Sequence, residues 1–373
     1  MKNIIHYVEE MFSLFSEHPF SSVDSLVLSQ LVYIRLPSCV PVLGEEKPLL
    51  RLGDLLRAEC FESMFRNVRD PENNRRLLFA LAASPRFRNI LVGNYSEQLD
   101  IQQEKQFAAV TFYLDTQTAY IAFRGTDATF IGWKEDFNMA FQSPVPSQEE
   151  ALIYLNSVAK QWPGTFLIGG HSKGGNLAVY SAMMSPVEIQ NRIRQIYSHD
   201  GPGFKAEILQ SSNFDQIQTR IHKTLPQSSI VGMLLENQEP YSIVKSNRFG
   251  IMQHDPFSWI VEEKQFSVLE RLSVTAKHMD HTLNGWLQTL SDGERERFID
   301  TLYTVLNAGG ITDFSQLETE WQKSLSAMLN AARNIEPDAR EFAFQTLKSF
   351  VTSGIRNLII PPKALLKNEH IEK

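Results

Sequence analysis

Apolar residues recur with helical spacing over the first part of the chain. Positions three or four apart carry most of them, and Ser21 and Ser22 are candidate caps for one of the runs. We expect the first 85 residues to be mainly helical, with helices over 21–34, 50–66 and 75–83.

The spacing changes to that of strands near residue 90. Runs rich in β-branched and aromatic residues predict strands, and the short polar separator at 115–117 predicts a hairpin. Later strands alternate with helical patterns, which favours an α/β fold with a mostly parallel, covered sheet. The predicted strands are 90–95, 107–114, 118–123, 165–169, 193–200, 218–224 and 241–245, and the intervening helices are 148–160, the run after residue 172, and 206–210.

The C-terminal part lacks strand signals and carries helical spacing throughout. We divide the chain into a domain over 1–265 and a helical region over 266–373, which is a candidate cap or a candidate homo-oligomer contact. The predicted helices are 268–290, 292–307, 313–334 and 337–355.

Composition narrows the class of protein. The 373 residues carry a formal charge of −7, so nothing suggests nucleic acid as a partner. No apolar stretch reaches the roughly 18 residues that a membrane span needs, and we expect no transmembrane segment and a cytoplasmic location. The two cysteines, Cys39 and Cys60, form neither a disulfide framework nor a zinc pattern, and we expect reduced thiols.

The run 170–174, Gly-His-Ser-Lys-Gly, lies between an apolar strand and a helical pattern. Such a glycine-framed serine is expected by chance in roughly one chain in eight of this length. The strand before it and the helix after it supply the context that the pattern requires. A sharp strand-to-helix turn leaves no room for flanking side chains and exposes the serine hydroxyl, so Ser172 is the predicted nucleophile.

A serine hydroxyl needs a base that removes its proton and an acid that orients the base. In an α/β-hydrolase arrangement both follow the serine, on loops at the carboxyl ends of strands. His254 is the histidine that combines a late position with a loop, and it is the predicted base. The other histidines after the serine lie in or beside strands, on a predicted helix or in the tail: His199, His222, His278, His281 and His370.

The acid is less closely defined by the residues. Asp200 ends the strand after the serine helix, where its carboxylate would face the same edge of the sheet, although a turn or capping aspartate is the structural alternative. Asp255 adjoins His254, and adjacent side chains of an extended loop point apart. Asp200 is favoured, and the alternatives Asp215, Glu236 and Glu239 stay open.

Attack on a carbonyl also needs donors for the developing oxyanion. The backbone N–H of the residue after the nucleophile, Lys173, supplies one by position. The strand-end run 124–127, Arg-Gly-Thr-Asp, could supply the second through Thr126, and a plain surface turn is its alternative. This chemistry needs no metal or cofactor, and we expect none.

Together these segments resemble a known family. The run 123–127 with Trp133 and Asp136, followed by 170–178, is similar to the class 3 lipase branch of the α/β-hydrolases. The fuller set resembles more closely a bacterial group of lipase-like proteins long catalogued as a domain of unknown function, over roughly residues 20–262. That set adds 198–204, 226–232 and 253–257.

The resemblance implies an α/β-hydrolase fold and a serine esterase that cleaves a carboxylic ester, such as an acyl lipid. It implies Ser172 as nucleophile, His254 as base, and Thr126 with Lys173 as oxyanion donors. Class 3 lipases carry the acid after a later strand, where this chain has no carboxylate, whereas Asp200 matches the acid of pancreatic-type lipases. Acyl or thioester transfer on the same residues, and a non-catalytic scaffold, are the alternative functions.

Overall fold

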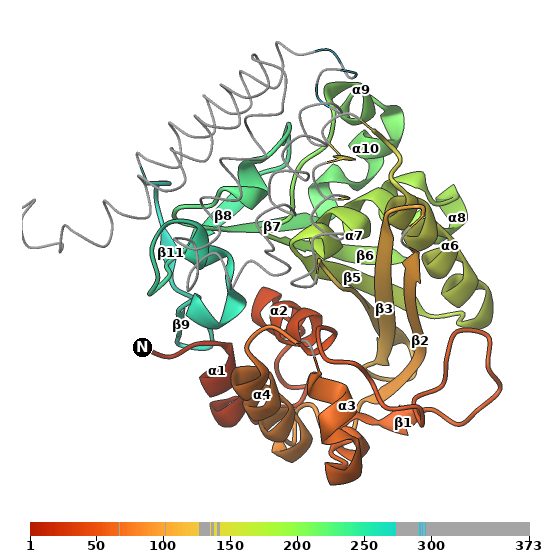
Figure 1. The fold of residues 1–373 in the computed structure, drawn as a ribbon, viewed down its shortest axis with the longest axis vertical. Coiled ribbons are helices and arrows are strands. Elements are labelled where there is room, and N and C mark those ends of the chain that lie inside the picture. Colours follow the sequence, from red (N-terminus) through yellow and green to blue (C-terminus); the bar gives the residue numbers. More distant parts are fainter. Residues whose placement is uncertain are drawn as a thin grey trace, which may run out of the picture.

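The computed structural model of the chain describes residues 1–273 apart from 67, 101, 127–134, 136–137 and 140–141, together with 291, 293 and 295. Its centre is a nine-stranded sheet in the spatial order β1-β2-β3-β4-β5-β6-β7-β8-β11, and β9 and β10 form a separate ribbon (Figure 1). The strands are β1 (Leu50–Arg51), β2 (Leu91–Asp100), β3 (Lys105–Tyr113), β4 (Thr118–Phe123), β5 (Thr165–His171), β6 (Ile193–His199), β7 (Ile221–Pro226), β8 (Tyr241–Val244), β9 (Val261–Glu262), β10 (Gln265–Phe266) and β11 (Val268–Leu269).

The sheet is mixed, which corrects the expectation of a mostly parallel one. Strands β4 to β8 run parallel to one another, whereas β1 to β4 pair antiparallel and β11 pairs antiparallel with β8. The short connections on either side of β3 explain the antiparallel half, because parallel neighbours need a crossover of a dozen or more residues. The α/β class and the predicted hairpin of β3 and β4 are confirmed.

Helices cover both faces of the sheet (Figure 1). One layer holds α1 (Ile4–Glu10), α2 (Ser22–Leu31), α3 (Phe61–Phe65) and α4 (Pro71–Ala83); the other holds α6 (Pro146–Gln161), α7 (Lys173–Met184), α8 (Val187–Gln190), α9 (Ala206–Leu209) and α10 (Ser212–Ile217). Alternation along β4 feeds the two layers: Tyr120 and Ala122 join the core under the N-terminal helices, and Ala119, Ile121 and Phe123 join the core under α6 and α7.

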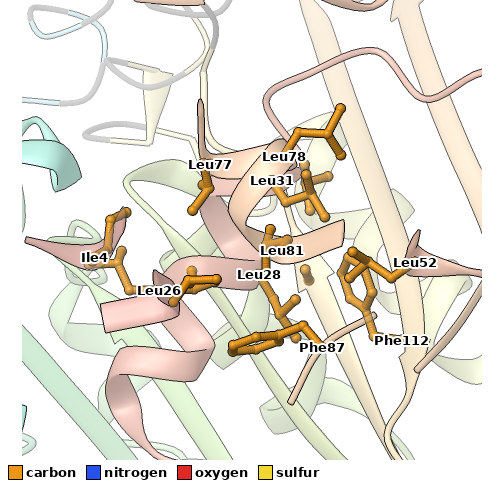
Figure 2. Close-up of a cluster of buried hydrophobic side chains, with 14 of the residues drawn as sticks. Ile4, Leu26, Leu28, Leu31, Leu52, Leu77, Leu78, Leu81, Phe87 and Phe112 are labelled. Atoms are coloured by element: carbon orange, nitrogen blue, oxygen red, sulfur yellow. The ribbon is translucent and has the colours of Figure 1, made fainter. Parts of the chain in front are cut away.

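Leucines of α2 and α4 interdigitate with aromatic side chains in the N-terminal layer (Figure 2). Leu26 and Leu28 of α2, Leu77 and Leu81 of α4, and Phe87 are all fully buried. Burial of each such side chain contributes roughly 1.5–3 kcal/mol. The helical layer is therefore an integral part of the core that supports the sheet.

The expected helix over 50–66 is largely wrong. Leu50–Arg51 pairs with the edge of β2, and two short 3-10 turns precede the five-residue α3. Leu52 and Leu55 are both fully buried, and a spacing of three suits a 3-10 turn as well as an α-helix. The apolar spacing fits helical turns, but its first two residues pair with the free edge of β2 instead.

The stretch after residue 264 also differs from its expected helical character. Val268–Leu269 pairs with β8 as the ninth strand, and Gln265–Phe266 pairs with β9. An unpaired strand edge favours such a partner, which helical spacing does not reveal. Residues 270–273 are not helical either, and nearly all of the rest of the predicted helix and of the three C-terminal helices lies outside the described residues. The division at 265 stays a prediction.

No helix within the described part of the chain is long and apolar enough to cross a membrane. Cys39 and Cys60 are both free thiols.

Candidate active site

The carboxyl ends of the parallel strands bring the predicted site residues to one edge of the sheet. Ser172 follows β5 directly and Asp200 follows β6, and the last residues of these two strands, His171 and His199, are register partners. Loops that follow the carboxyl ends of parallel strands are where α/β sheets commonly bind ligands.

Ser172 has a backbone conformation that few non-glycine residues adopt. Its φ is 58° and its ψ is −133°, at the point where β5 turns into α7. Its N–H donates to the carbonyl oxygen of His199 at 2.9 Å, and its own carbonyl accepts from the N–H of Gly175 at 2.9 Å. A conformation of this kind costs of order 1–3 kcal/mol and persists only where its surroundings enforce it. The sharp turn predicted from the sequence is present.

The glycines around Ser172 are required by close backbone contacts. A Cβ on Gly170 would lie 2.2 Å from the carbonyl carbon of Gly174, and a Cβ on Gly174 would lie 2.1 Å from the carbonyl oxygen of Phe123. Gly125, after β4, approaches so closely that its Cβ would lie 3.0 Å from that of Ser172. The turn after β4 is thereby packed against the serine.

Asp200 and His254 meet although 54 residues separate them in the chain. The Asp200 Oδ2 lies 2.6 Å from the His254 Nδ1. The Asp200 side chain is fully buried, and that of His254 is 12% exposed. His254 ends a 3-10 turn, Gly250–His254, in the loop after β8. This contact uses Nδ1, so Nε2 is the ring nitrogen that is not engaged with Asp200.

Two donors that the sequence did not reveal hold the other oxygen of the Asp200 carboxylate. The Ser229 hydroxyl and the Gly232 N–H both donate to Oδ1, the latter at 3.1 Å. A Cβ on Gly232 would lie 2.4 Å from that oxygen, so only glycine allows the approach. Both come from the loop after β7, which is where class 3 lipases carry their acid. The serine-rich turn and the glycine of that loop are the sequence signal that could have revealed these two donors.

The alternative acids have other partners or positions. Asp255 pairs with Arg248 at 2.5 Å and accepts from a nearby main-chain N–H, and Glu239 pairs with Lys223 at 3.2 Å. Asp215 lies exposed on α10, and Glu236 exchanges main-chain hydrogen bonds with Phe204.

The other described histidines after Ser172 have different surroundings. His199 is fully buried between the hydroxyls of Ser25 and Thr224, each 2.9 Å from one ring nitrogen. Burial lowers the pKa of His199 to about 3, so it is neutral at physiological pH. His222 is exposed and stacks on Tyr197. His278, His281 and His370 lie outside the described residues.

His171, immediately before the serine, is a further residue of the site that the sequence did not single out. Its Nε2 lies 2.8 Å from the carbonyl oxygen of His254, and its Nδ1 lies 3.0 Å from the Tyr33 hydroxyl. The two imidazole rings are 4.5 Å apart between centroids. Burial, together with the charge of His254, lowers the pKa of His171 well below its usual value. A neutral His171 thus ties the turn of Ser172 to the loop of His254.

The predicted oxyanion donors belong to the two segments that adjoin the serine. Lys173 is the first residue of α7, and Thr126 follows Gly125 in the turn packed against Ser172. The ammonium group of Lys173 is fully buried and points elsewhere, to Glu135 at 2.7 Å. Trp133 and Asp136 lie outside the described residues.

A cleft of about 440 Å³ lies away from this edge. It opens between the start of α2 and strands β7, β8 and β10, and neither Ser172, Asp200 nor His254 lines it. Within the described part of the chain, no group of three His, Cys, Asp or Glu side chains is arranged to hold a metal ion.

Comparison with known proteins gives the family. The family model described as Mbeg1-like matches residues 81–304, more than half of the chain. No curated protein matches. Among solved structures, the chain resembles the native propeptide complex of Rhizomucor miehei lipase at 16% identity and a TM-score of 0.33, over 56% of this chain and 68% of that one. A deletion mutant of that complex is 17% identical, with a TM-score of 0.35, over 58% of this chain and 70% of that one. TM-scores this low are too weak to bear on the function of the chain. The family match, in contrast, covers more than half of the sequence, and the chain belongs to the Mbeg1-like family, whose domain is lipase-like.

Proposed function

We propose that this chain is a serine hydrolase of the α/β-hydrolase type that cleaves a carboxylic ester through an acyl-enzyme on Ser172. The observation that carries the proposal is the 2.6 Å contact between Asp200 and His254, at the sheet edge where Ser172 occupies its positive-φ turn. The three residues follow one another in the chain order Ser, Asp, His, which is the order of nucleophile, orienting acid and base in α/β-hydrolases.

In the proposed reaction, Nε2 of His254 takes the proton of the Ser172 hydroxyl as the serine oxygen attacks the ester carbonyl carbon. Collapse of the tetrahedral intermediate breaks the bond to the alkoxy group, which leaves as an alcohol with that proton. Water then attacks the acyl-enzyme with His254 again as base, which releases the acid and restores the serine. Asp200 keeps the proton on Nδ1 and stabilises the imidazolium that forms.

The backbone N–H groups of Lys173 and Thr126 are the proposed oxyanion donors. The close approach of Gly125 to Ser172 supports this assignment, because the turn after β4 packs against the Ser172 side chain at its β-carbon. Donors fixed by strand and helix ends need little rearrangement as charge develops, which is how such groups lower a barrier.

Within the lipase-like relatives, we place the chain with the bacterial group related to class 3 lipases. Asp200 takes the role of the acid from the strand before the one used in class 3 lipases, and the later loop contributes Ser229 and Gly232 as its donors. The contact of His254 with a buried carboxylate weighs against a scaffold without chemistry. Nothing in the site favours acyl transfer over hydrolysis.

The test is covalent labelling with a fluorophosphonate probe. We expect the native chain to be labelled and Ser172→Ala to remain unlabelled, with equal thermal stability as the control for folding. Labelling that persists in Ser172→Ala, or a folded native chain that does not react, would refute the proposal. A series of nitrophenyl esters of increasing chain length then measures the substrate class, because a preference for long chains indicates lipids.

A further inference from the structure

The residue after the proposed nucleophile takes part in an ion pair that is fully removed from water. The Lys173 Nζ lies 2.7 Å from the Glu135 Oε2, and both side chains are 0% exposed. Removing two charges from water costs several kcal/mol per ion unless further hydrogen bonds compensate. The contacts of this costly pair, one residue from Ser172, therefore indicate which parts of the site it holds in place.

Main-chain groups from two other elements complete the pair. Lys173 also donates to the carbonyl oxygen of Gln106 at 2.8 Å, and the N–H of Gln106 donates to Glu135 at 3.1 Å. The second oxygen of Glu135 accepts from the N–H of Ser147 at 2.9 Å. The pair therefore fixes the starts of β3, α6 and α7 to one another.

Glu135 belongs to the chain segment between β4 and α6, which begins with the turn of Gly125 and Thr126. Lys173 begins α7. Among the described residues, the connection to Thr126 runs through β3. Gln106 lies two residues before Ala108, whose carbonyl oxygen accepts from the N–H of Arg124 at 2.9 Å, directly before Gly125 and Thr126. The pair thus joins the start of α7, with the N–H of Lys173, to the strand end that leads into the N–H of Thr126. A change in the pair would shift one segment relative to the other without touching Ser172, Asp200 or His254.

We propose that the buried Glu135–Lys173 pair sets the spacing of the two oxyanion donors, so that both side chains are positioning residues for the reaction on Ser172. This inference rests on the proposed hydrolase function. It predicts that disrupting the pair weakens binding of the tetrahedral transition state and leaves binding of the ground-state ester nearly unchanged.

The experiment uses Glu135→Gln, Lys173→Met and the double variant in the full chain. We expect kcat on a nitrophenyl ester to fall about 10- to 100-fold, with KM within about threefold. The inhibition constant of an alkyl boronic acid, whose serine adduct is a tetrahedral anion, should rise in proportion to the loss of kcat/KM. The double variant should be no slower than the worse single variant, because the two groups act as a unit.

The matched control is Arg86→Met, which breaks an equally buried ion pair with Asp24 in the N-terminal helical layer. We expect lower stability for this variant, with unchanged kcat and boronate affinity per folded molecule.

If Lys173→Met or Glu135→Gln folds and keeps native kcat and boronate affinity, this inference is overturned and the proposed function is not. A native chain that neither hydrolyses esters nor labels at Ser172 would overturn the proposed function and this inference with it. The double variant, which leaves no lone buried charge, covers the case in which the Lys173 variant does not fold.

Discussion

Within the described part of the chain, two regions bury an ion pair completely, and we expect the two pairs to serve different ends. In the N-terminal helical layer, Arg86 pairs with Asp24 at 2.7 Å and donates to the main-chain oxygens of Ser13 and His18. At the sheet edge, Lys173 pairs with Glu135 at the same distance, with both side chains equally buried. Geometry and burial alone do not distinguish the two pairs.

The difference lies in what the partners are attached to. Asp24 also caps the start of α2 through Ser21 and accepts from the Tyr7 hydroxyl, so that network closes within the helical layer. Lys173 adjoins Ser172 in the chain. Polar groups buried at equal cost are therefore expected to affect stability in the first region and reaction rate in the second.

The largest effect is expected from Asp200→Asn. An asparagine can present its amide nitrogen to Nδ1 of His254, which favours the tautomer that cannot accept the serine proton. We expect kcat/KM to fall about 10³- to 10⁴-fold with the thermal midpoint little changed. The control is Asp255→Asn, because that neighbouring carboxylate pairs with Arg248 instead. Activity within tenfold of native would remove Asp200 from the role of the acid.

Arg86→Met should give the next largest effect, on stability alone. It leaves the Asp24 carboxylate buried without its cation, and such a change typically costs about 3–5 kcal/mol in the free energy of unfolding. Urea denaturation measures that loss, and kcat per folded molecule should stay native. Arg76→Met, which breaks an exposed pair with Glu9, should cost at most about 1 kcal/mol. A fall in kcat for Arg86→Met would contradict the separation of the two regions.

Much of the site could be predicted because its features are local in the sequence. Strand, glycine-framed serine and helix follow one another within twenty residues, and β4, β5 and β6 were expected within a residue or two of their observed ends. The carboxyl ends of parallel strands meet at one edge, so Ser172 and Asp200 could be placed together from the strand pattern alone. Their catalytic roles remain a proposal.

Groups that act across the fold could not be predicted. Ser229 and Gly232 reach Asp200 from the loop after the next strand, and Tyr33 reaches His171 from the residues after α2, more than a hundred positions away. A serine, a glycine or a tyrosine carries no local signal of such a partner. The same reason explains β1 and β11, whose strand character comes from the free edges of β2 and β8.

His199 links the two regions and gives a pH-dependent test. Its ring bridges Ser25 of α2 and Thr224 of β7, and burial lowers its pKa to about 3. Because the unfolded chain takes up this proton near pH 6.5, stability is full above that pH and declines as pH falls towards 3. We expect a loss of about 2 kcal/mol between pH 8 and pH 5 that is absent in His199→Gln. Denaturation at both pH values gives the difference, and parallel curves for the two proteins would contradict the assignment.

The smallest effect is expected from Ser229→Ala. This variant tests whether a donor to the buried Asp200 carboxylate affects reaction rate or only stability. The variant removes one donor from the Asp200 carboxylate and keeps the Gly232 N–H. Loss of one such hydrogen bond costs about 1–2 kcal/mol, so we expect kcat/KM to fall about five- to thirtyfold. Ser228→Ala is the control, because that hydroxyl contacts Ser273 rather than the carboxylate.

What decides the outcome is whether the loss from Ser229→Ala appears in rate or only in stability. If the hydroxyl serves the acid, kcat/KM falls, and the loss shrinks when Asp200→Asn is already present, because the two residues then act through the same contact. If stability falls while kcat/KM stays native, Ser229 belongs with Arg86 as a purely structural group. A carboxylate buried beside the nucleophile would then tolerate the loss of a donor as readily as one in the helical layer, and the contrast between the regions would rest on Lys173 and Glu135 alone.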